Sequence, residues 1–339
     1  MIVIMKNTAL QEDINEVVKT LEGCGLKADI SKGTDATVIG IVGDKRQLGE
    51  ITLELYPGVE KCVAILESYK LASRSFMPAG RKVSVGNIEI GGTELIMMAG
   101  PCAVESEEQI TSAAWAVSRS GAKFLRGGAY KPRTSPYAYQ GMENEGFKLL
   151  RQAADQWDLK VVSEIISETQ LDTAAKYCDM FQVGARNMQN FRLLKEIGKS
   201  KVPVLLKRGI ASTINEWLDA AEYILSEGNY NVVLCERGIR TFETATRNTL
   251  DISSIPVIKE KSNLPIIIDP SHAAGKKAYI ESLSLASVAA GADGLIVEVH
   301  PEPVKAMSDA AQQLPFDDFN NLCKKLDPIA RVVGKRYFI

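Results

Sequence analysis

Eight apolar, strand-like runs recur between residues 94 and 300, and nearly every one ends in a charged or metal-binding side chain. The runs read ELIMMAGPC, KFLRGGAYK, KVVSEI, MFQVGAR, VPVLLKR, NVVLCER, LPIIIDPSH and GLIVEVH, and segments of helical composition separate them. Eight alternating β and α units of this size predict an α/β fold, the (β/α)8 TIM barrel, whose active site lies where the strands end. This pattern therefore predicts both the architecture and the place of the chemistry.

Residues 1–70 follow a different pattern. The strand-like runs IVIM, KADIS, ATVIGIV and VEKCVAI alternate with one helical segment after IVIM and a second, QLGEITLEL, before the last run. The order β-α-β-β-α-β is that of a ferredoxin-like unit. We interpret residues 71–92 as a linker and a hairpin, VSVGNIEIGG, that closes the bottom of the barrel, and residues 93–339 as the barrel itself.

Composition limits the partners and the compartment. The net charge is -2 over 339 residues, which argues against a nucleic-acid binder that relies on overall basicity, so any cationic site must be local. Six widely spread cysteines suit a reducing cytoplasm better than a disulfide framework. No apolar run reaches the ~18 residues of a membrane span and no signal peptide opens the chain, so we expect a cytoplasmic protein with no membrane partner.

The strand-like runs can be tested by parity, because residues two apart in a strand share a face. Four runs pair an apolar residue with a charged one in this way: Val162 with Glu164, Leu205 with Lys207, Cys235 with Arg237, and Ile296 with Glu298. If these faces point inward, the barrel has apolar lower layers and a charged upper layer.

Four residues at or beyond the strand ends are candidate metal ligands: Cys102, His272, Glu298 and Asp309. Taken singly, Cys102 is equally a small buried hydrophobe, His272 a hydrogen-bonded residue at the core edge, and Asp309 a helix cap. Glu298 is harder to dismiss, because a carboxylate in a buried strand needs a partner. A thiolate, an imidazole and two carboxylates together suit Fe(II), Zn, Co or Mn rather than Mg or Ca.

Basic residues gather at the same strand ends, accompanied by two hydroxyls: Arg126, Lys131, Arg133, Thr134, Ser135, Arg186, Lys207 and Arg237. One such cation alone is usually a solvated surface residue. Several at the ends of buried strands repel one another unless anions bind there, and arginine forks match phosphate and carboxylate oxygens. We infer two anionic substrates, at least one phosphorylated. Three roles remain open for the carboxylate of Glu164: it forms an ion pair with a neighbouring cation, it holds a water molecule for attack, or it transfers a proton.

The segments GPC, LRGGAYKPRTSP, GARNMQNF, LLKRG, CERGIRTF, DPSH and VEVHPEP resemble 3-deoxy-D-arabino-heptulosonate 7-phosphate (DAHP) synthase over residues 70–339. The ferredoxin-like head resembles the type Iβ branch, which carries a regulatory N-terminal domain. The resemblance implies one divalent metal ion (Mn, Fe, Co or Zn) on Cys102, His272, Glu298 and Asp309. It assigns phosphoenolpyruvate to Arg126, Lys131, Arg186, Lys207 and Arg237, and the phosphate of erythrose 4-phosphate to Arg133, Thr134 and Ser135. It also implies that Ala185 is a substrate-binding residue.

The implied activity is an aldol-like condensation of phosphoenolpyruvate with erythrose 4-phosphate and water, which gives DAHP and phosphate as the first step of the shikimate pathway. The implied catalytic residues are Lys131, Glu164, Lys207 and His272. The resemblance also implies a homotetramer that is feedback-inhibited by an aromatic amino acid such as tyrosine or phenylalanine.

Three alternatives remain open. One is 3-deoxy-D-manno-octulosonate 8-phosphate synthase, which uses arabinose 5-phosphate; its loop typically reads Lys-Ala-Asn-Arg where this chain has Lys-Pro-Arg, so KPRTS favours the four-carbon sugar. Another is a Schiff-base aldolase on the same fold, with Lys207 or Lys131 as nucleophile. The third is a non-catalytic sensor of phosphorylated metabolites, which would not need a complete set of metal ligands.

Overall fold

The computed structural model describes residues 1–33, 36–43, 45–49, 51–63, 67–132, 135 and 137–338. The chain forms two compact units, one made of residues 1–81 with 259–263 and the other of residues 82–258 with 264–339. All six cysteines are free thiols. Among the described residues, no helix combines the length and the apolar character needed to cross a membrane.

The N-terminal unit is an antiparallel sheet packed against one helix. Its strands are β1 (Ile2–Met5), β2 (Lys27–Lys32), β3 (Thr37–Val42) and β4 (Val59–Val63), in the order β2-β3-β1-β4, and its helix is α1 (Gln11–Gly23). Helix α1 buries Ile14, Val17 and Leu21 in a cluster with apolar residues of the sheet. This is the predicted ferredoxin-like arrangement.

The prediction of a second helix in this unit, over the segment QLGEITLEL, is wrong. In its place are two single turns of 3-10 helix, Lys45–Leu48 and Leu53–Leu55. Gly49 between them has a φ of +54°, a left-handed conformation that stops a right-handed helix.

A short hairpin precedes the barrel, with strands β5 (Val83–Val85) and β6 (Ile88–Ile90). Its side chains Val83, Val85, Ile88 and Ile90 belong to the same buried cluster as residues of the barrel interior. The hairpin therefore contributes directly to the core that the barrel encloses.

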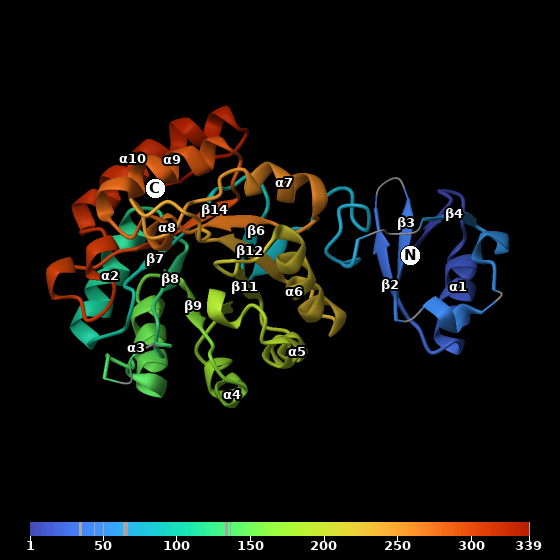
Figure 1. The fold of residues 1–339 in the computed structure, drawn as a ribbon, viewed down its shortest axis with the longest axis horizontal. Coiled ribbons are helices and arrows are strands. Elements are labelled where there is room, and N and C mark those ends of the chain that lie inside the picture. Colours follow the sequence, from blue (N-terminus) through green and yellow to red (C-terminus); the bar gives the residue numbers. More distant parts are fainter. Residues whose placement is uncertain are drawn as a thin grey trace. The chain divides into compact units, whose positions relative to one another are not determined.

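Eight parallel strands close into a ring, and helices surround it (Figure 1). The strands are β7 (Ile96–Gly100), β8 (Phe124–Arg126), β9 (Lys160–Glu164), β10 (Met180–Val183), β11 (Val204–Lys207), β12 (Val232–Glu236), β13 (Ile266–Ile268) and β14 (Gly294–Glu298). The helices are α2 (Glu107–Arg119), α3 (Glu143–Asp155), α4 (Leu171–Ala174), α5 (Phe191–Ser200), α6 (Ile214–Ser226), α7 (Ser254–Lys261), α8 (Pro270–Ala274), α9 (Ile280–Ala289) and α10 (Phe316–Val332). All eight predicted strands are present, and β14 pairs with β7 to complete the predicted (β/α)8 barrel.

The parity prediction is confirmed at the core. The buried cluster inside the barrel contains Val162, Leu205, Cys235 and Ile296. Two residues further along the chain come Glu164, Lys207 and Glu298, which end their strands, and Arg237, which directly follows β12. Since side chains alternate between the two faces of a strand, these four form a charged layer above the apolar one.

Candidate active site

A cavity of about 460 Å³ lies at the carboxyl ends of the barrel strands. Its lining residues are Arg126, Lys131, Pro132, Glu164, Gln182, Gly184, Ala185, Arg186, Lys207, Ile210, Arg237, Arg240, Arg247, Asn248, His272 and Asp309. Seven of these side chains are Lys or Arg and two are carboxylates, although the chain as a whole carries a net charge of -2. The cavity is thus a local concentration of positive charge suited to anionic ligands.

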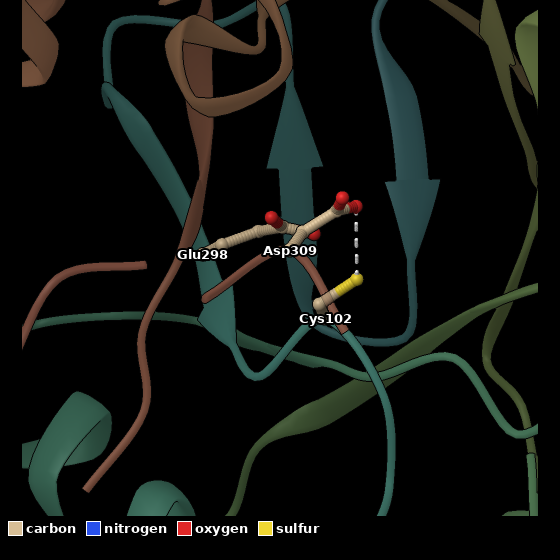
Figure 2. A group of neighbouring side chains, drawn as sticks. All are labelled: Cys102, Glu298 and Asp309. Carbon is tan, nitrogen blue, oxygen red and sulfur yellow. Dashed lines mark hydrogen bonds between the residues drawn. The ribbon is translucent and has the colours of Figure 1, made fainter. Parts of the chain in front are cut away.

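Three of the predicted metal ligands meet beside this cavity. One ligand atom from each of Cys102, Glu298 and Asp309 lies within 4.8 Å of the others (Figure 2). The fourth, His272, brings its Nε2 to 3.5 Å from Glu298 Oε1. The structure therefore brings three of the predicted ligands together and places His272 against one of them, Glu298. The mixture of sulfur, nitrogen and oxygen donors fits one divalent ion of borderline softness.

The loop after β14 supplies Asp309 and also supports its neighbours. Gln312 Nε2 donates a hydrogen bond to Glu298 Oε2 at 2.6 Å. Arg247 donates to Asp309 Oδ1 at 3.2 Å and to Gln312 Oε1 at 3.0 Å. These contacts hold the two carboxylates toward each other, and outer partners of this kind commonly orient metal ligands.

Burial changes the acidity of two of these donors. It is the main reason why the pKa of the Cys102 thiol rises to about 11, and the nearby negative charge of Glu298 adds to it. Burial also lowers the pKa of His272 below its ordinary value, which favours the neutral imidazole that metals bind. The thiol must lose its proton before it can act as a ligand.

Asp269, which follows β13, connects His272 with Lys207. Its Oδ2 lies 2.6 Å from His272 Nδ1 and 2.5 Å from Lys207 Nζ. Burial opposes ionisation of this carboxyl, but its hydrogen bonds from His272 and its electrostatic interactions with His272 and Lys207 outweigh burial and hold its pKa well below the usual value. Because Nδ1 faces Asp269, Nε2 is the nitrogen left toward the ligand cluster.

Two further cations border the same cluster. Lys131 Nζ donates to the carbonyl of Cys102 at 2.9 Å and lies 3.1 Å from its Sγ. Arg126 donates from one guanidinium nitrogen to the carbonyl of Pro101 at 2.7 Å and to Glu298 Oε1 at 2.9 Å. Positive charge therefore lies directly against the candidate metal ligands.

Several cations of the cavity have no carboxylate within ion-pair distance in the described part of the chain. Within the part of the chain that the structure describes, Lys131, Arg186, Arg237 and Arg240 form no ion pair with a carboxylate. Arg237 is buried, and among the described residues its guanidinium donates to the carbonyl of Gly238 alone, at 3.3 Å. Burying an arginine without an anionic partner is costly, so this arrangement favours anion binding.

Glu164 lies on the wall of the cavity with Gln182 and Gly184 of the neighbouring strand and its end. Gln182 Nε2 is 3.4 Å from Glu164 Oε2. A Cβ atom at Gly184 would lie only 2.0 Å from Glu164 Oε1, so the missing side chain makes room for the carboxylate. Three roles were open for Glu164. Among the described residues its side chain forms no ion pair with a cation, and its hydrogen-bond partner is the amide of Gln182.

The structure treats the predicted substrate residues unequally. Ala185 and Arg186 line the cavity as expected. Arg133 and Thr134 lie outside the described residues. Ser135 is exposed, its hydroxyl accepts from the N–H of Tyr137 at 3.3 Å, and it is not among the residues that line the cavity.

Sequence reasoning missed several lining or supporting residues, namely Gln182, Arg240, Arg247, Asn248 and Asp269. For Gln182 and Asp269 a signal existed: each lies two residues beyond an interior apolar residue, Met180 and Ile267. Asp269 also occupies the N-cap of α8, where its Oδ1 accepts from the N–H of His272. The other three lie on a loop whose path depends on contacts with distant segments.

Comparison with known proteins gives consistent matches. The DAHP synthetase I family matches residues 70–331, and the DAHP synthase ferredoxin-like domain matches residues 1–67. A protein of Thermotoga maritima named phospho-2-dehydro-3-deoxyheptonate aldolase is 49% identical over 334 residues, covering 98% of this chain and 99% of that protein. A protein of Geobacter sulfurreducens named 2-dehydro-3-deoxyphosphooctonate aldolase is 31% identical over 275 residues, covering 75% of this chain and 99% of that protein.

Solved structures agree with these matches. The crystal structure of the Thermotoga maritima DAHP synthase has a TM-score of 0.79 and 48% identity, covering 99% of this chain and 98% of that one. A truncated form of 3-deoxy-D-arabino-heptulosonate 7-phosphate synthase from the same organism has a TM-score of 0.74 and 47% identity, covering 79% of this chain and 99% of that one. The likeness therefore extends over both units of the chain.

Proposed function

The chain belongs to the DAHP synthetase I family and is an enzyme, a 3-deoxy-7-phosphoheptulonate synthase; on this premise we propose how its cavity binds and joins the two substrates. The reaction condenses phosphoenolpyruvate with erythrose 4-phosphate and water and releases phosphate. The observation that supports the proposal best is the group of cations without carboxylate partners beside a mixed set of metal ligands.

Phosphoenolpyruvate carries a phosphate and a carboxylate, and both match the cations of the cavity. In this proposal Arg186, Arg237 and Lys207 bind the phosphate side, and Arg126 and Lys131 bind the carboxylate side, with the backbone of Ala185 against the ligand. The cations also offset the charge that develops as the new bond forms. Arg133, Thr134 and Ser135 remain the proposed contacts of the erythrose 4-phosphate group.

Cys102, His272, Glu298 and Asp309 are the proposed ligands of one divalent ion, Mn, Fe, Co or Zn. Such an ion, when bound, supplies Lewis-acid chemistry to an aldehyde oxygen. The residues around it have their own tasks. Asp269 keeps the imidazole of His272 oriented, and Arg247 with Gln312 holds the carboxylates of Asp309 and Glu298.

The bond-making step needs a proton balance. C3 of phosphoenolpyruvate forms a bond to the aldehyde carbon of erythrose 4-phosphate, and the π electrons of the carbonyl move to its oxygen, which takes up one proton and becomes a hydroxyl. C2 of phosphoenolpyruvate becomes cationic, and the proton taken up is matched by the one that water gives up there. Water adds at C2 as Glu164 accepts its proton, while Lys207 keeps the water and the phosphate in position. The resulting hemiketal phosphate loses inorganic phosphate, whose charge the same cations bind.

The N-terminal unit is proposed to be regulatory. The lining residues identified in the described part of the chain all belong to the other unit, that of the barrel. We propose that it binds tyrosine or phenylalanine in a homotetramer and lowers activity by feedback. Six free thiols are consistent with the proposed cytoplasmic location.

A phosphate-release assay tests the proposal. Phosphoenolpyruvate is supplied with erythrose 4-phosphate, arabinose 5-phosphate or ribose 5-phosphate, before and after treatment with a chelator. We expect turnover with erythrose 4-phosphate that a chelator abolishes and a divalent metal restores. Faster turnover with arabinose 5-phosphate would favour the octulosonate alternative, inactivation by borohydride would favour a Schiff base, and no turnover at all would favour a sensor.

A further inference from the structure

One loop supplies much of the positive charge of the cavity. The segment 237–251 leaves the end of β12 and leads to α7. It contributes Arg237, Arg240, Arg247 and Asn248 to the lining, and we call it the arginine loop. The position of this loop decides where three of the seven cations stand.

Both ends of the arginine loop are fixed to one buried carboxylate. The N–H of Gly238, near its start, donates to Glu236 Oε1 at 2.7 Å. The N–H of Asp251, at its end, donates to the same oxygen at 3.4 Å. Glu236 is fully buried, so water does not compete for these bonds. A single oxygen thus sets the distance between the two ends.

A buried arginine holds this carboxylate in turn. Arg208 donates from one nitrogen to Glu236 Oε2 at 3.1 Å and to Asp251 Oδ2 at 2.7 Å. Its Nε donates to the carbonyl of Ser212 at 3.0 Å, and its guanidinium carbon lies 5.8 Å from the centre of the Trp217 ring. Charges that are buried and mutually paired in this way occupy one arrangement, because any other leaves a charge without a partner.

The cluster of Arg208, Glu236 and Asp251 lies outside the set that lines the cavity. Arg208 follows Lys207, and Glu236 precedes Arg237. Since adjacent residues of a strand point to opposite faces, Lys207 and Arg237 face the cavity while their neighbours face the layer outside the barrel wall. Any effect of the cluster on substrate must therefore pass through the loop that it holds.

Further along, the arginine loop is tied to itself and to α8. Ile239 and Thr249 exchange two backbone hydrogen bonds, at 2.8 and 2.9 Å. Asn248 donates from its backbone to the carbonyl of Ala273 at 2.9 Å and from its side chain to that of His272 at 3.1 Å. Because these hydrogen bonds make the loop rigid, a displacement at its base would also displace its cationic side chains.

We propose that Glu236, held by Arg208 and Asp251, is a positioning residue that places the arginine loop for phosphoenolpyruvate binding. This inference rests on the proposed function, in which Arg237 binds that substrate. Glu236 touches neither substrate nor metal ligands. It acts by fixing the backbone from which Arg237, Arg240 and Arg247 reach the cavity.

The test is Glu236→Gln in the full-length, metal-loaded protein, with phosphoenolpyruvate binding measured by isothermal titration calorimetry. Glutamine has nearly the same shape. If its oxygen still accepts from the two loop N–H groups, its amide nitrogen is a donor facing the donors of Arg208, and if the side chain turns to satisfy Arg208, the amide nitrogen faces the two N–H groups, so either the loop or Arg208 loses its acceptor. We expect the Kd for phosphoenolpyruvate to rise about tenfold or more. The kcat at saturating substrate should change less than the Kd, because the reacting groups themselves are intact.

Asp293→Asn is a matched control. Asp293 is equally buried, accepts from the N–H of Ile266 at 2.8 Å and pairs with Lys335 at 2.9 Å, but it lies at the amino ends of the strands. This variant should lower the thermal midpoint while leaving the Kd for phosphoenolpyruvate within about twofold, because the contacts it loses lie at the other end of the strands. A purely structural role for Glu236 predicts the same result for both variants.

The outcomes separate the inference from its premise. Two results overturn the inference while the proposed function stands. In one, folded Glu236→Gln binds phosphoenolpyruvate with the wild-type Kd. In the other, its Kd rises no more than that of Asp293→Asn. Wild-type protein that does not bind phosphoenolpyruvate overturns the proposed function itself. If Glu236→Gln does not fold, Asp251→Asn decides: a raised Kd supports the positioning role and an unchanged Kd overturns it.

Discussion

The carboxylate of Glu164 occupies the position at the wall of the cavity that a side chain at residue 184 would need: a Cβ on Gly184 would lie 2.0 Å from Glu164 Oε1. The atom that would be struck is the far end of a flexible side chain, so a substitution would move the carboxylate rather than the barrel. Gly184→Ala should therefore leave the thermal midpoint almost unchanged and lower kcat by about 10- to 100-fold, since a displacement of this size misplaces a reacting group. Steady-state kinetics with a melting curve test this.

Two comparisons sharpen that measurement. Glu164→Asp shortens the side chain, so adding Gly184→Ala to it should cost less activity than adding it to wild type, and a double-mutant cycle measures the difference. Gly23→Ala is the control, because a Cβ there meets nothing within 4 Å. Additive effects in the cycle would mean that the two residues do not compete for space.

Cys102→Ser tests the metal site. A hydroxyl is a much poorer ligand than a thiolate for a borderline metal, so the variant should lose most activity and bound metal while it remains folded. Metal content after dialysis, measured by mass spectrometry, is the direct readout. Cys178→Ser is the control, because that thiol is also buried but does not belong to the ligand cluster. Full turnover of chelator-treated wild type would contradict the assignment.

Arg133→Ala and Arg237→Ala should affect different substrates. Removal of a charge-assisted contact costs about 1.5–3 kcal/mol, which corresponds to roughly 10- to 150-fold in affinity. We expect Arg133→Ala to raise the KM for erythrose 4-phosphate more than that for phosphoenolpyruvate, and Arg237→Ala to do the reverse. Equal changes in both constants for either variant would count against its assignment.

Deletion of residues 1–70 tests the regulatory role. The described cavity draws no lining residue from this segment, so the shortened chain should keep turnover and lose its response to tyrosine or phenylalanine. Inhibition of the intact enzyme should change affinity by about 5- to 150-fold, the usual range for two coupled sites. If the intact enzyme responds to neither amino acid, nor to tryptophan, chorismate or prephenate, a role in assembly becomes the better account.

The sequence predicted the site residues best where they lie on a strand or directly after one. A period of two places Arg126, Glu164, Lys207 and Arg237 on one layer, because the pleat of a strand leaves little freedom once its apolar residues are buried. Loops obey no such period. The loop that carries Arg247 is hydrogen-bonded to α8 and to Ile210, in the segment after β11, and those partners are distant in the sequence. The failed helix prediction near Gly49 has a local cause, since one left-handed residue outweighs the helix propensity of its neighbours.

The pairing of β14 with β7 has a consequence for the order of folding. Glu298 ends the last strand of the ring, and Cys102 follows the first, so the two lie together only after the strands at opposite ends of the barrel sequence have joined. No partly folded intermediate that lacks this junction can contain the site. Recovery of activity during refolding should therefore lag behind the formation of helices, and any ligand that binds the finished site will favour the closed ring over open forms by mass action.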